Sequence, residues 1–421
     1  MGMKVLVIGS GAREHAIAHT LMRADSVDEV TVAPGNPGMR LDGIRTTELS
    51  TSNHAALIDF VKNNGYDWVF VGPEVPLIEG IVDDFADAGI KAFGPSRAAA
   101  QIEGSKDFAK QLMIRHGIPT AGYHTFEDLD LAETYVREHG APIVIKADGL
   151  AAGKGVTVAM DVETAMRALR DIFVDHRFGS AGAKVVIEEF LEGQEFSLMS
   201  FVRGADFWPM PISQDHKRAY DADKGPNTGG MGAYSPVPQI GRDVVDAAIE
   251  TIVRPTVQAM VDDGTPFTGI LYAGLIATVD GPKVIEFNAR FGDPETEVVL
   301  PQLTSDLGES IDALLHGGTP TFTWNTSDAT LGVVLASDGY PTNVVKGAAI
   351  PRIDVDANSH VYYAGVAQGD DGLIASSGRV LLVECSAPDI RQAQRKVYGI
   401  IDGLDTTGMF YRHDIGAKAL K

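Results

Sequence analysis

Residues 143–158 read IVIKADGLAAGKGVTV, and this stretch does most to decide the fold. Two β-rich runs, Ile143–Lys146 and Val156–Val158, flank a glycine-rich connection. The connection looks like a P-loop, but a P-loop has four residues between its glycines and a Gly-Lys-Ser/Thr that opens a helix. Here three residues separate Gly149 from Gly153, and the lysine is followed by another glycine and a strand. We therefore expect two strands joined by a flap that closes over a triphosphate through its amides and two lysines; a plain flexible hairpin is the alternative.

The first hundred residues alternate β-rich runs with amphipathic helical windows. We expect strands at Val5–Ile8, Glu29–Val32, Trp68–Val71 and Ile90–Phe93, and helices near Arg13–Ala24, His54–Asn63 and Leu77–Ala88. This alternation implies parallel pairing, because right-handed crossovers bring each strand back beside an earlier one. Every strand ends in a Gly/Pro turn, and in such sheets ligands bind at the carboxyl ends of the strands.

The first of these turns, Gly9-Ser10-Gly11-Ala12-Arg13-Glu14, is a candidate anion site. It follows a strand and opens a helix, so its N–H groups suit a phosphate. A dinucleotide fingerprint needs a third glycine where Glu14 stands, and an acidic residue where the chain reads Ala33-Pro34-Gly35-Asn36. Arg13 opposes the helix dipole, a small cost that makes sense if an anion binds there. The turn therefore favours a small phosphorylated ligand over the two alternatives, a plain tight turn and NAD.

Beyond residue 105 the pattern is mixed α and β. Gly and Pro are dense between Asp206 and Pro238, and the tail after residue 320 is β-rich. Helices are expected at Lys106–His116, Asp161–Val174, Asp243–Asp262, around Thr296–Leu315 and near Pro388–Ile401, and strands at Lys184–Glu188, Gly269–Val279 and Lys283–Asn288.

Two oxygen-bearing side chains end the last of these strands. Glu286 and Asn288 are two residues apart, so they share a strand face while Phe287 packs behind. A carboxylate and an amide oxygen, completed by phosphate oxygens and waters, suit Mg²⁺. A solvated strand end is the alternative, and the segment Arg290–Glu295 directly afterwards favours the metal site.

Three further segments are candidates for binding. The run Val186–Leu191 ends a strand in a turn whose backbone can bond an adenine, with Glu195 close by for ribose hydroxyls. Ser213–Arg218 and Asn227–Pro236 are long, polar, glycine-rich loops, and such loops in a compact domain are usually functional or disordered. His216 is expected to be solvated or hydrogen-bonded rather than catalytic.

Composition excludes several classes of protein. The 421 residues carry 35 Lys+Arg and 57 Asp+Glu, a formal net charge of −22. A surface this acidic repels phosphate backbones, so we expect no nucleic-acid or membrane partner. The single cysteine, Cys385, excludes an intrachain disulfide and fits a cytoplasmic location. No apolar run approaches the roughly 18 residues that span a bilayer.

Taken in order, these motifs resemble the ATP-grasp superfamily, and in detail the glycinamide ribonucleotide synthetase family of purine biosynthesis. The most specific stretches are Lys146–Gly155, Gln214–Arg218, Asn227–Pro236 and Val284–Thr296. The resemblance implies a ligase that converts 5-phosphoribosylamine, glycine and ATP to glycinamide ribonucleotide, ADP and phosphate, with Mg²⁺ or Mn²⁺. It implies an α/β and α+β multidomain chain: a Rossmann-like parallel sheet (1–103), an ATP-grasp core (104–122 and 192–323), a small lid (123–191) and a β-rich C-terminal domain (324–421).

The resemblance also implies roles for single residues. In many superfamily members a further carboxylate stands where this chain reads Tyr272-Ala273-Gly274, so the number of metals and the third ligand stay open. The implied sets are, for the ATP phosphates, Lys106, Lys146, Gly149, Gly153, Lys154 and Gly155; for adenine and ribose, Glu188, Leu191 and Glu195; for metal, Glu286 and Asn288; for the phosphoribosyl group, Gly9, Gly11, Arg13, Glu14 and Asn36; for the amine and glycine, Asp215, Lys217, Arg290 and Asp293, which with Lys146 form the catalytic set.

The implied chemistry agrees with the residues. Phosphoryl transfer needs positioning and charge neutralisation, and no protein nucleophile, so the lack of a Ser/His/Asp or Cys/His arrangement is consistent. We expect a monomer that binds small molecules. The alternatives are another ATP-grasp carboxylate–amine ligase or carboxylase, an NAD-dependent oxidoreductase, and a nucleotide-sensing module without turnover.

Overall fold

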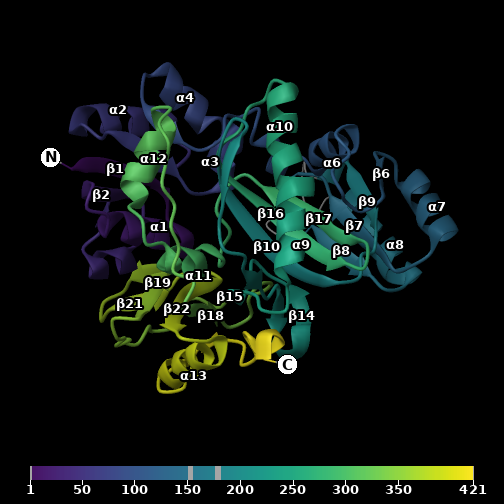
Figure 1. Cartoon of the computed structure of the whole chain (residues 1–421). Coiled ribbons are helices and arrows are strands. Elements are labelled where there is room, and N and C mark those ends of the chain that lie inside the picture. The colour runs from purple at the N-terminus through teal and green to yellow at the C-terminus, as the bar shows by residue number, and fades with distance from the viewer. Residues whose placement is uncertain (1, 150–154, 176–181, 421) are drawn as a thin grey trace.

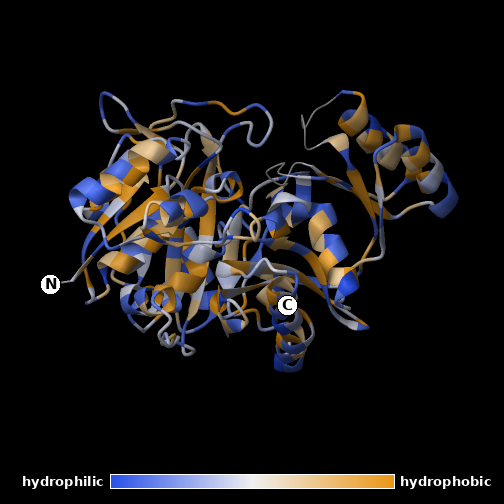
Figure 2. Ribbon diagram, turned by 90° about the horizontal axis from the view of Figure 1, so that it is seen from above, coloured by the Kyte–Doolittle hydropathy of each residue, from blue (hydrophilic) through white to orange (hydrophobic). Residues whose placement is uncertain are grey.

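The computed structural model describes residues 2–149, 155–175 and 182–420. Its sheets form separate layers: a parallel sheet near the N-terminus, a central antiparallel sheet, a small sheet at one end, and a C-terminal sheet below (Figure 1). Hydrophobic residues concentrate in the strands, and the small end sheet with its helices stands beside the rest (Figure 2). This is the mixed α/β, multidomain fold that the sequence predicts.

The N-terminal sheet is parallel, with strand order β3-β2-β1-β4-β5. The four expected strands are present, and the short β3 was not expected. The helix expected at Leu77–Ala88 is wrong as a single element: Gly80 adopts φ +91° and separates α3 from α4. The elements are β1 Met3–Gly9, α1 Ala12–Met22, β2 Val27–Pro34, β3 Arg45–Thr46, α2 His54–Asn64, β4 Trp68–Val71, α3 Glu74–Glu79, α4 Ile81–Asp87 and β5 Lys91–Phe93.

The central sheet is antiparallel, with strand order β11-β10-β16-β17. Its helical cover includes α5, α6 and a long helix in which α9 and α10 flank a π-helical turn, Ile249–Val253. The elements are α5 Gln101–Gly104, α6 Lys106–Arg115, β10 Gln194–Arg203, β11 Asp206–Pro209, α9 Arg242–Ala248, α10 Arg254–Asp262, β16 Thr268–Thr278 and β17 Gly281–Asn288.

The small sheet has strand order β6-β9-β7-β8, and α7 and α8 pack together beside it. Its apolar core, which includes Val136, Ile145, Leu169 and Ile187, is a cluster of its own. The elements are β6 Tyr123–Phe126, α7 Leu129–His139, β7 Ile143–Ala147, β8 Val156–Ala159, α8 Val162–Phe173 and β9 Val185–Glu189.

The C-terminal sheet has order β12-β15-β18-β22-β19, with β23 paired to β18. Two of its strands come from the glycine-rich region expected to be loop, which folds into short strands instead. The helix α13 packs on β18 and β22. The elements of this sheet and its helix are β12 Gln214–Asp215, β15 Gly232–Ser235, β18 Ala329–Ser337, β19 Ser359–Tyr363, β22 Arg379–Ala387, α13 Ile390–Ile401 and β23 Met409–Phe410. Two-stranded sheets are formed by β13 Arg218–Tyr220 with β14 Lys224–Asn227 and by β20 Val366–Gln368 with β21 Leu373–Ala375.

The single helix expected around Thr296–Leu315 is also wrong. The chain forms α11 (Thr296–Val299), a 3₁₀ turn at Leu300–Gln302, a non-helical connection over residues 303–306, and then α12 (Leu307–Leu315). Asp306 caps the second helix by accepting the N–H of Glu309 at 2.8 Å. Asp306 also accepts hydrogen bonds from Ser26, and α12 therefore lies against the N-terminal sheet.

One apolar cluster joins the three larger sheets. It runs from Leu6 in β1 through Leu198 in β10 to Leu331 in β18, all fully buried. The N-terminal, central and C-terminal parts therefore pack as one body against which the small sheet is placed.

Candidate active site

The candidate site lies where the carboxyl edge of the N-terminal sheet faces the end of β17. In this sheet β1 sits between β2 and β4, so the chain leaves β1 toward one side and returns at β4 on the other. A crevice forms outside the strand ends at such a switch point. Arg13 in the first turn of α1 and Glu74 at the start of α3 follow the turns after β1 and β4, and their side chains approach within 3.9 Å.

The glycine-rich turn after β1 is closed by its own acidic residue. Glu14 accepts the N–H of Gly11 at 2.7 Å and pairs with the Arg13 guanidinium at 2.6 Å. Gly9 has φ +131°, and a Cβ there would collide with the Glu14 side chain. The Gly11 N–H expected to face a phosphate therefore donates to a carboxylate, and the negative charge of Glu14 disfavours a dinucleotide pyrophosphate.

Asn36 is buried beside this turn and has several partners already. Its amide donates to the Ser10 carbonyl at 2.8 Å and the Tyr363 carbonyl at 2.9 Å. Its side-chain oxygen accepts the N–H of Gly38. Asn36 thus ties the turn after β1 to β19 of the C-terminal sheet.

The end of β17 carries the candidate metal ligands on a β-bulge. Val284 pairs with Leu275 and Glu286 with the adjacent Gly274, so Ile285 is an extra residue on this strand. A bulge shifts the side-chain alternation by one residue. Glu286 and Asn288 are partly exposed and Phe287 is buried, as the sequence predicts. Val284 is also buried, although it is two residues before Glu286, because the bulge shifts the alternation between them.

The lysines expected to face ATP phosphates converge from two elements. Lys146 on β7 donates to the Ile285 carbonyl at 3.0 Å, and Lys106 at the start of α6 donates to the Gly149 carbonyl at 2.8 Å. Burial lowers the pKa of Lys106, and Glu286 opposes that shift. Gly155 accepts the N–H of Ala147 at 2.8 Å. Gly153 and Lys154 lie outside the described residues.

The adenine and ribose candidates lie at the end of β9 and the start of β10. Glu188 is 4% exposed and pairs with Lys146 at 2.9 Å and with Lys110 at 3.2 Å. Leu191 is half-buried in the connection. Glu195 is half exposed, and its carboxylate lies 3.9 Å from the Lys217 ammonium.

Lys217 links this group to the candidate metal ligands. Its ammonium lies 3.7 Å from Glu286. Burial opposes its charge, but Asp215, Glu286 and Glu195 raise the pKa of Lys217 well above its ordinary value. Burial raises the pKa of Asp215 to about 7, while Lys217 opposes this shift.

Arg290 binds two carboxylates that were not expected in the site. It pairs with Glu103 at 3.0 Å and with Glu74 at 3.4 Å, and it donates to the Asn288 side-chain oxygen at 3.2 Å. Burial raises the pKa of Glu103 to about 7 against the effect of Arg290. Burial acts the same way on Glu74, but Arg290 and Arg13 lower its pKa to about 2.

Asp293 is held from the C-terminal sheet. The Arg379 guanidinium pairs with its carboxylate at 3.0 Å and donates to its carbonyl at 2.8 Å. The same group donates to the Gly229 carbonyl at 2.9 Å. Arg379 thereby joins the loop before β15 to the segment after β17.

The structure brings most of the predicted residues into one continuous region and adds four to it. The missed residues are Lys110, Glu74, Glu103 and Arg379. Two of them had a signal: Lys110 stands four residues after Lys106, on the same helical face, and Glu74 directly follows the turn after β4. His216 differs from expectation, because it is buried and its ring nitrogens have no hydrogen-bond partner among the described residues. Burial lowers its pKa to about 3.

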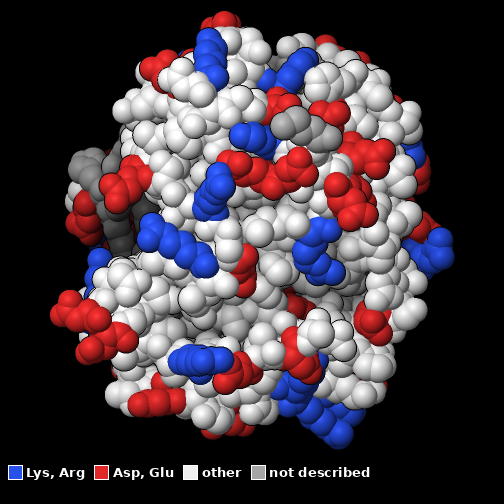
Figure 3. Space-filling view, turned by 90° about the vertical axis from the view of Figure 1, so that its left-hand side faces the viewer, with Lys and Arg blue, Asp and Glu red and all other residues white. Residues whose placement is uncertain are grey.

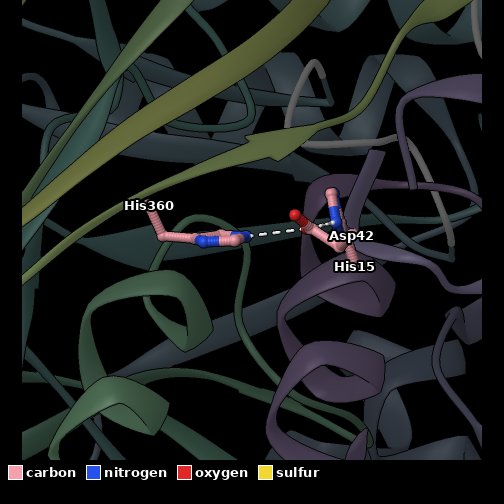
Figure 4. A group of neighbouring side chains, drawn as sticks. All are labelled: His15, Asp42 and His360. Atoms are coloured by element: carbon pink, nitrogen blue, oxygen red, sulfur yellow. Dashed lines mark hydrogen bonds and ion pairs between the residues drawn. The ribbon is translucent and has the colours of Figure 1, made fainter. Parts of the chain in front are cut away.

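A separate group, His15, Asp42 and His360, has metal-ligand chemistry and joins α1 to β19 (Figure 4). The Nε2 atoms of His15 and His360 lie 2.6 and 2.9 Å from one oxygen of Asp42. The Tyr363 N–H donates to Nδ1 of His15, so a neutral His15 carries its proton on Nε2 and donates it to Asp42. A ring in that state offers no lone pair to an ion, and we interpret the group as a hydrogen-bonded contact.

Basic and acidic side chains are interspersed over the face of the molecule drawn in Figure 3. The net charge of −22 therefore does not form one acidic field on that face. Within the described residues, no helix is long and apolar enough to cross a membrane.

Comparison with known proteins identifies the family. Models of the phosphoribosylglycinamide synthetase N domain, ATP-grasp (A) domain and C domain match residues 3–103, 104–296 and 330–418. Phosphoribosylamine–glycine ligases of Streptococcus pyogenes serotype M6 and Streptococcus pneumoniae are 54% and 53% identical to the chain over 421 residues, all of both chains.

Solved structures agree. The phosphoribosylamine–glycine ligase of Thermotoga maritima is 32% identical, with TM-score 0.85, covering 98% of this chain and 100% of that one. A biotin carboxylase domain from Hydrogenobacter thermophilus shares the fold, with TM-score 0.74 and 13% sequence identity. That match covers 98% of this chain and 92% of the other. The chain belongs to the phosphoribosylglycinamide synthetase family.

Proposed function

We propose that this chain joins glycine to 5-phosphoribosylamine at the expense of ATP, giving glycinamide ribonucleotide, ADP and phosphate in purine biosynthesis. The observation that carries the proposal is the continuous charged region from Lys106 and Lys146, through Lys217 and Glu286, to Arg290 and Arg13. It spans a nucleotide end and a sugar end, which is what a ligase for these substrates needs. The full-length relatives named phosphoribosylamine–glycine ligase support it.

The nucleotide end holds ATP. By the family resemblance, the phosphates are bound by Lys106, Lys146, Gly149, Gly153, Lys154 and Gly155, of which Gly153 and Lys154 lie outside the described residues. Glu188 and Leu191 border the adenine, and Glu195 takes ribose hydroxyls. The convergence of two lysines beside the flap supports this assignment, because each neutralises charge that develops on the phosphoryl oxygens.

A divalent cation binds at Glu286 and Asn288. The donor set fits Mg²⁺ or Mn²⁺, since both atoms are hard oxygens and the two residues, two apart on β17, share one face. Burial disfavours ionisation, but Lys217, Lys146 and Lys106 keep the pKa of Glu286 below its ordinary value, so the ligand is anionic at neutral pH. The bound ion supplies charge neutralisation on the phosphate oxygens.

The reaction runs in two steps. A carboxylate oxygen of glycine attacks the γ-phosphorus, the bond to the β,γ-bridging oxygen breaks, and ADP leaves with that electron pair. The amine of phosphoribosylamine then attacks the carbonyl carbon of glycyl phosphate, phosphate leaves, and the nitrogen loses a proton. Lys217, Arg290, Asp215 and Asp293 orient the two small substrates. Acyl phosphates hydrolyse readily, so the lid must exclude water.

The turn Gly9–Glu14 and Asn36 face the phosphoribosyl group. Arg13 supplies the cation at this end, and the carboxylate of Glu14 suits a sugar hydroxyl better than a phosphate oxygen, because it accepts hydrogen bonds and carries negative charge.

A coupled assay of ADP release tests the proposal. We expect turnover only when glycine and freshly made 5-phosphoribosylamine are both present. Full ADP release with bicarbonate or another acid in place of glycine would assign the chain to a different ATP-grasp ligase activity.

Three further expectations belong to the same proposal. We infer that the chain divides into four domains: the N-terminal domain (1–103), the ATP-grasp core (104–122 and 192–323), the lid (123–191) and the C-terminal domain (324–421). The sheet of the C-terminal domain also includes β12 and β15. We infer a monomer without nucleic-acid or membrane partners, which sedimentation equilibrium tests. We infer a cytoplasmic location, which fractionation of the source cells tests.

A further inference from the structure

Arg379, the first residue of β22 in the C-terminal sheet, holds Asp293 at two of its groups. One guanidinium nitrogen, Nη2, pairs with Oδ1 of the Asp293 carboxylate at 3.0 Å, and the other, Nη1, donates to the Asp293 carbonyl at 2.8 Å. A residue that is bound at both its side chain and its backbone has little freedom to rotate about the bonds between them. Arg379 therefore fixes the direction in which the Asp293 carboxylate points.

The same arginine holds the glycine-rich loop before β15. Its Nη1 also donates to the carbonyls of Gly229 at 2.9 Å and Gly230 at 3.3 Å. The Gly229 N–H donates to the Tyr340 hydroxyl at 3.0 Å, so a second side chain from the C-terminal part anchors the loop. A planar guanidinium with five N–H donors can bind acceptors that converge in this way, whereas the single ammonium of a lysine cannot reproduce the geometry.

Glu297, four residues after Asp293, does not compete for this guanidinium. Its carboxyl is fully buried, and neither oxygen has a hydrogen-bond partner among the described residues. Burial, and then the nearby charge of Asp293, raise the pKa of Glu297 well above its ordinary value. A buried carboxyl without partners favours the neutral form, so the charge of Arg379 is balanced by Asp293.

The second carboxylate oxygen of Asp293 faces the sugar end of the site. A Cβ added to Gly11, in the turn after β1, would lie 3.7 Å from Oδ2 of Asp293. Burial opposes the charge of Arg13 in the same region, but Glu14, Glu74 and Asp293 together raise its pKa. With Oδ1 bound to the C-terminal sheet, Oδ2 is the oxygen directed at this turn.

We propose that Arg379 is a positioning residue for the sugar amine: it orients Asp293 so that Oδ2 accepts an N–H of 5-phosphoribosylamine. This inference rests on the proposed function, which assigns the phosphoribosyl group to the turn after β1. An ionised carboxylate only accepts hydrogen bonds, and an amine donates them. An amine held through its N–H keeps its lone pair for the carbonyl carbon of glycyl phosphate, and such orientation supplies a large part of the rate. The C-terminal sheet thus serves the reaction without touching the substrate.

Steady-state kinetics of the full chain, with one substrate varied at a time, test the proposal. In Arg379→Met we expect kcat/KM for freshly made 5-phosphoribosylamine to fall about ten- to hundredfold, because Asp293 loses its orientation. The KM values for glycine and MgATP should stay within about twofold of wild type. Arg379→Lys keeps the charge without the fork geometry and should show an intermediate loss. The control Arg352→Met, which removes an exposed arginine of the C-terminal part, should behave as wild type.

A double-variant cycle with Asp293→Asn separates positioning from a general loss of structure. If Arg379 acts through Asp293, adding Arg379→Met to Asp293→Asn should lower kcat/KM by less than about threefold further. Asp293→Asn alone does not depend on the folding of the arginine variants, and it should lower kcat/KM for the sugar amine at least as much as Arg379→Met.

Three results would overturn the positioning role. They are an unchanged kcat/KM for the sugar amine in Arg379→Met or in Asp293→Asn, losses that multiply in the double variant, and KM values that rise equally for all three substrates. Each of them requires an active wild type and leaves the proposed function standing. A wild type that releases no ADP with glycine and 5-phosphoribosylamine would instead refute the proposed function, and this inference with it.

Discussion

Glu384 in β22 offers a stability test whose size follows from burial. Its carboxyl is 3% exposed and accepts a hydrogen bond from the Ser386 hydroxyl at 2.8 Å. Burial raises its pKa to about 8 from 4.5. Glutamine has nearly the same shape, and its side-chain oxygen keeps the hydrogen bond from Ser386. Glu384→Gln therefore removes the titration and little else.

The sign of the effect follows from proton linkage. The folded state holds the proton of Glu384 up to about pH 8, whereas the unfolded chain releases it near pH 4.5. Wild-type stability is therefore fully present below pH 4.5 and is lost as pH rises toward 8, by at most about 1.4 kcal/mol per pH unit. Between pH 5.5 and 7.5 wild type should lose about 2–3 kcal/mol relative to Glu384→Gln.

Urea denaturation of both proteins at the two pH values measures this difference. Every other titrating group is common to both proteins and cancels in the comparison. We expect Glu384→Gln to gain on wild type as the pH rises from 5.5 to 7.5. A stability difference that is the same at both pH values would refute the reasoning, because it would mean that Glu384 is already ionised in the folded protein.

Three further predictions concern the site. Glu286→Ala should abolish turnover and leave the circular dichroism spectrum unchanged, because it removes the proposed anionic metal ligand. The control variant Asp280→Ala, in the turn before β17, should keep its activity. An active Glu286→Ala variant would refute the metal assignment. Arg290→Met should destabilise the protein by about 3–5 kcal/mol in urea denaturation, since it leaves the buried Glu103 without its cation and leaves the half-buried Glu74 with Arg13 alone, at 3.9 Å; the added change Glu103→Gln should restore part of this loss, and no recovery would contradict the pairing. Chelation of divalent cations should stop ADP release, and Mg²⁺ or Mn²⁺ should restore it; full activity in excess chelator would exclude a metal requirement.

The sequence by itself determined the local elements and the family. Strand and helix periodicity located four of the five N-terminal strands, and the glycine-rich flap with its flanking strands separated this chain from P-loop proteins. The order of the motifs then identified the family, which the comparisons confirm. These features depend on neighbours in the chain, so spacing alone reveals them.

Tertiary structure decided which side chains meet. The bulge at Ile285 turns Glu286 and Asn288 outward, and its position depends on pairing with β16, which no local pattern encodes. The partners of Arg290 come from residues about 190 and 220 positions earlier in the chain. Glu188 likewise has two cations on one oxygen because α6 brings Lys110 to the oxygen that Lys146 also contacts. Contacts between distant segments depend on how the sheets pack, and for that reason the sequence predicted candidate site residues but not the counter-charges that the structure places beside them.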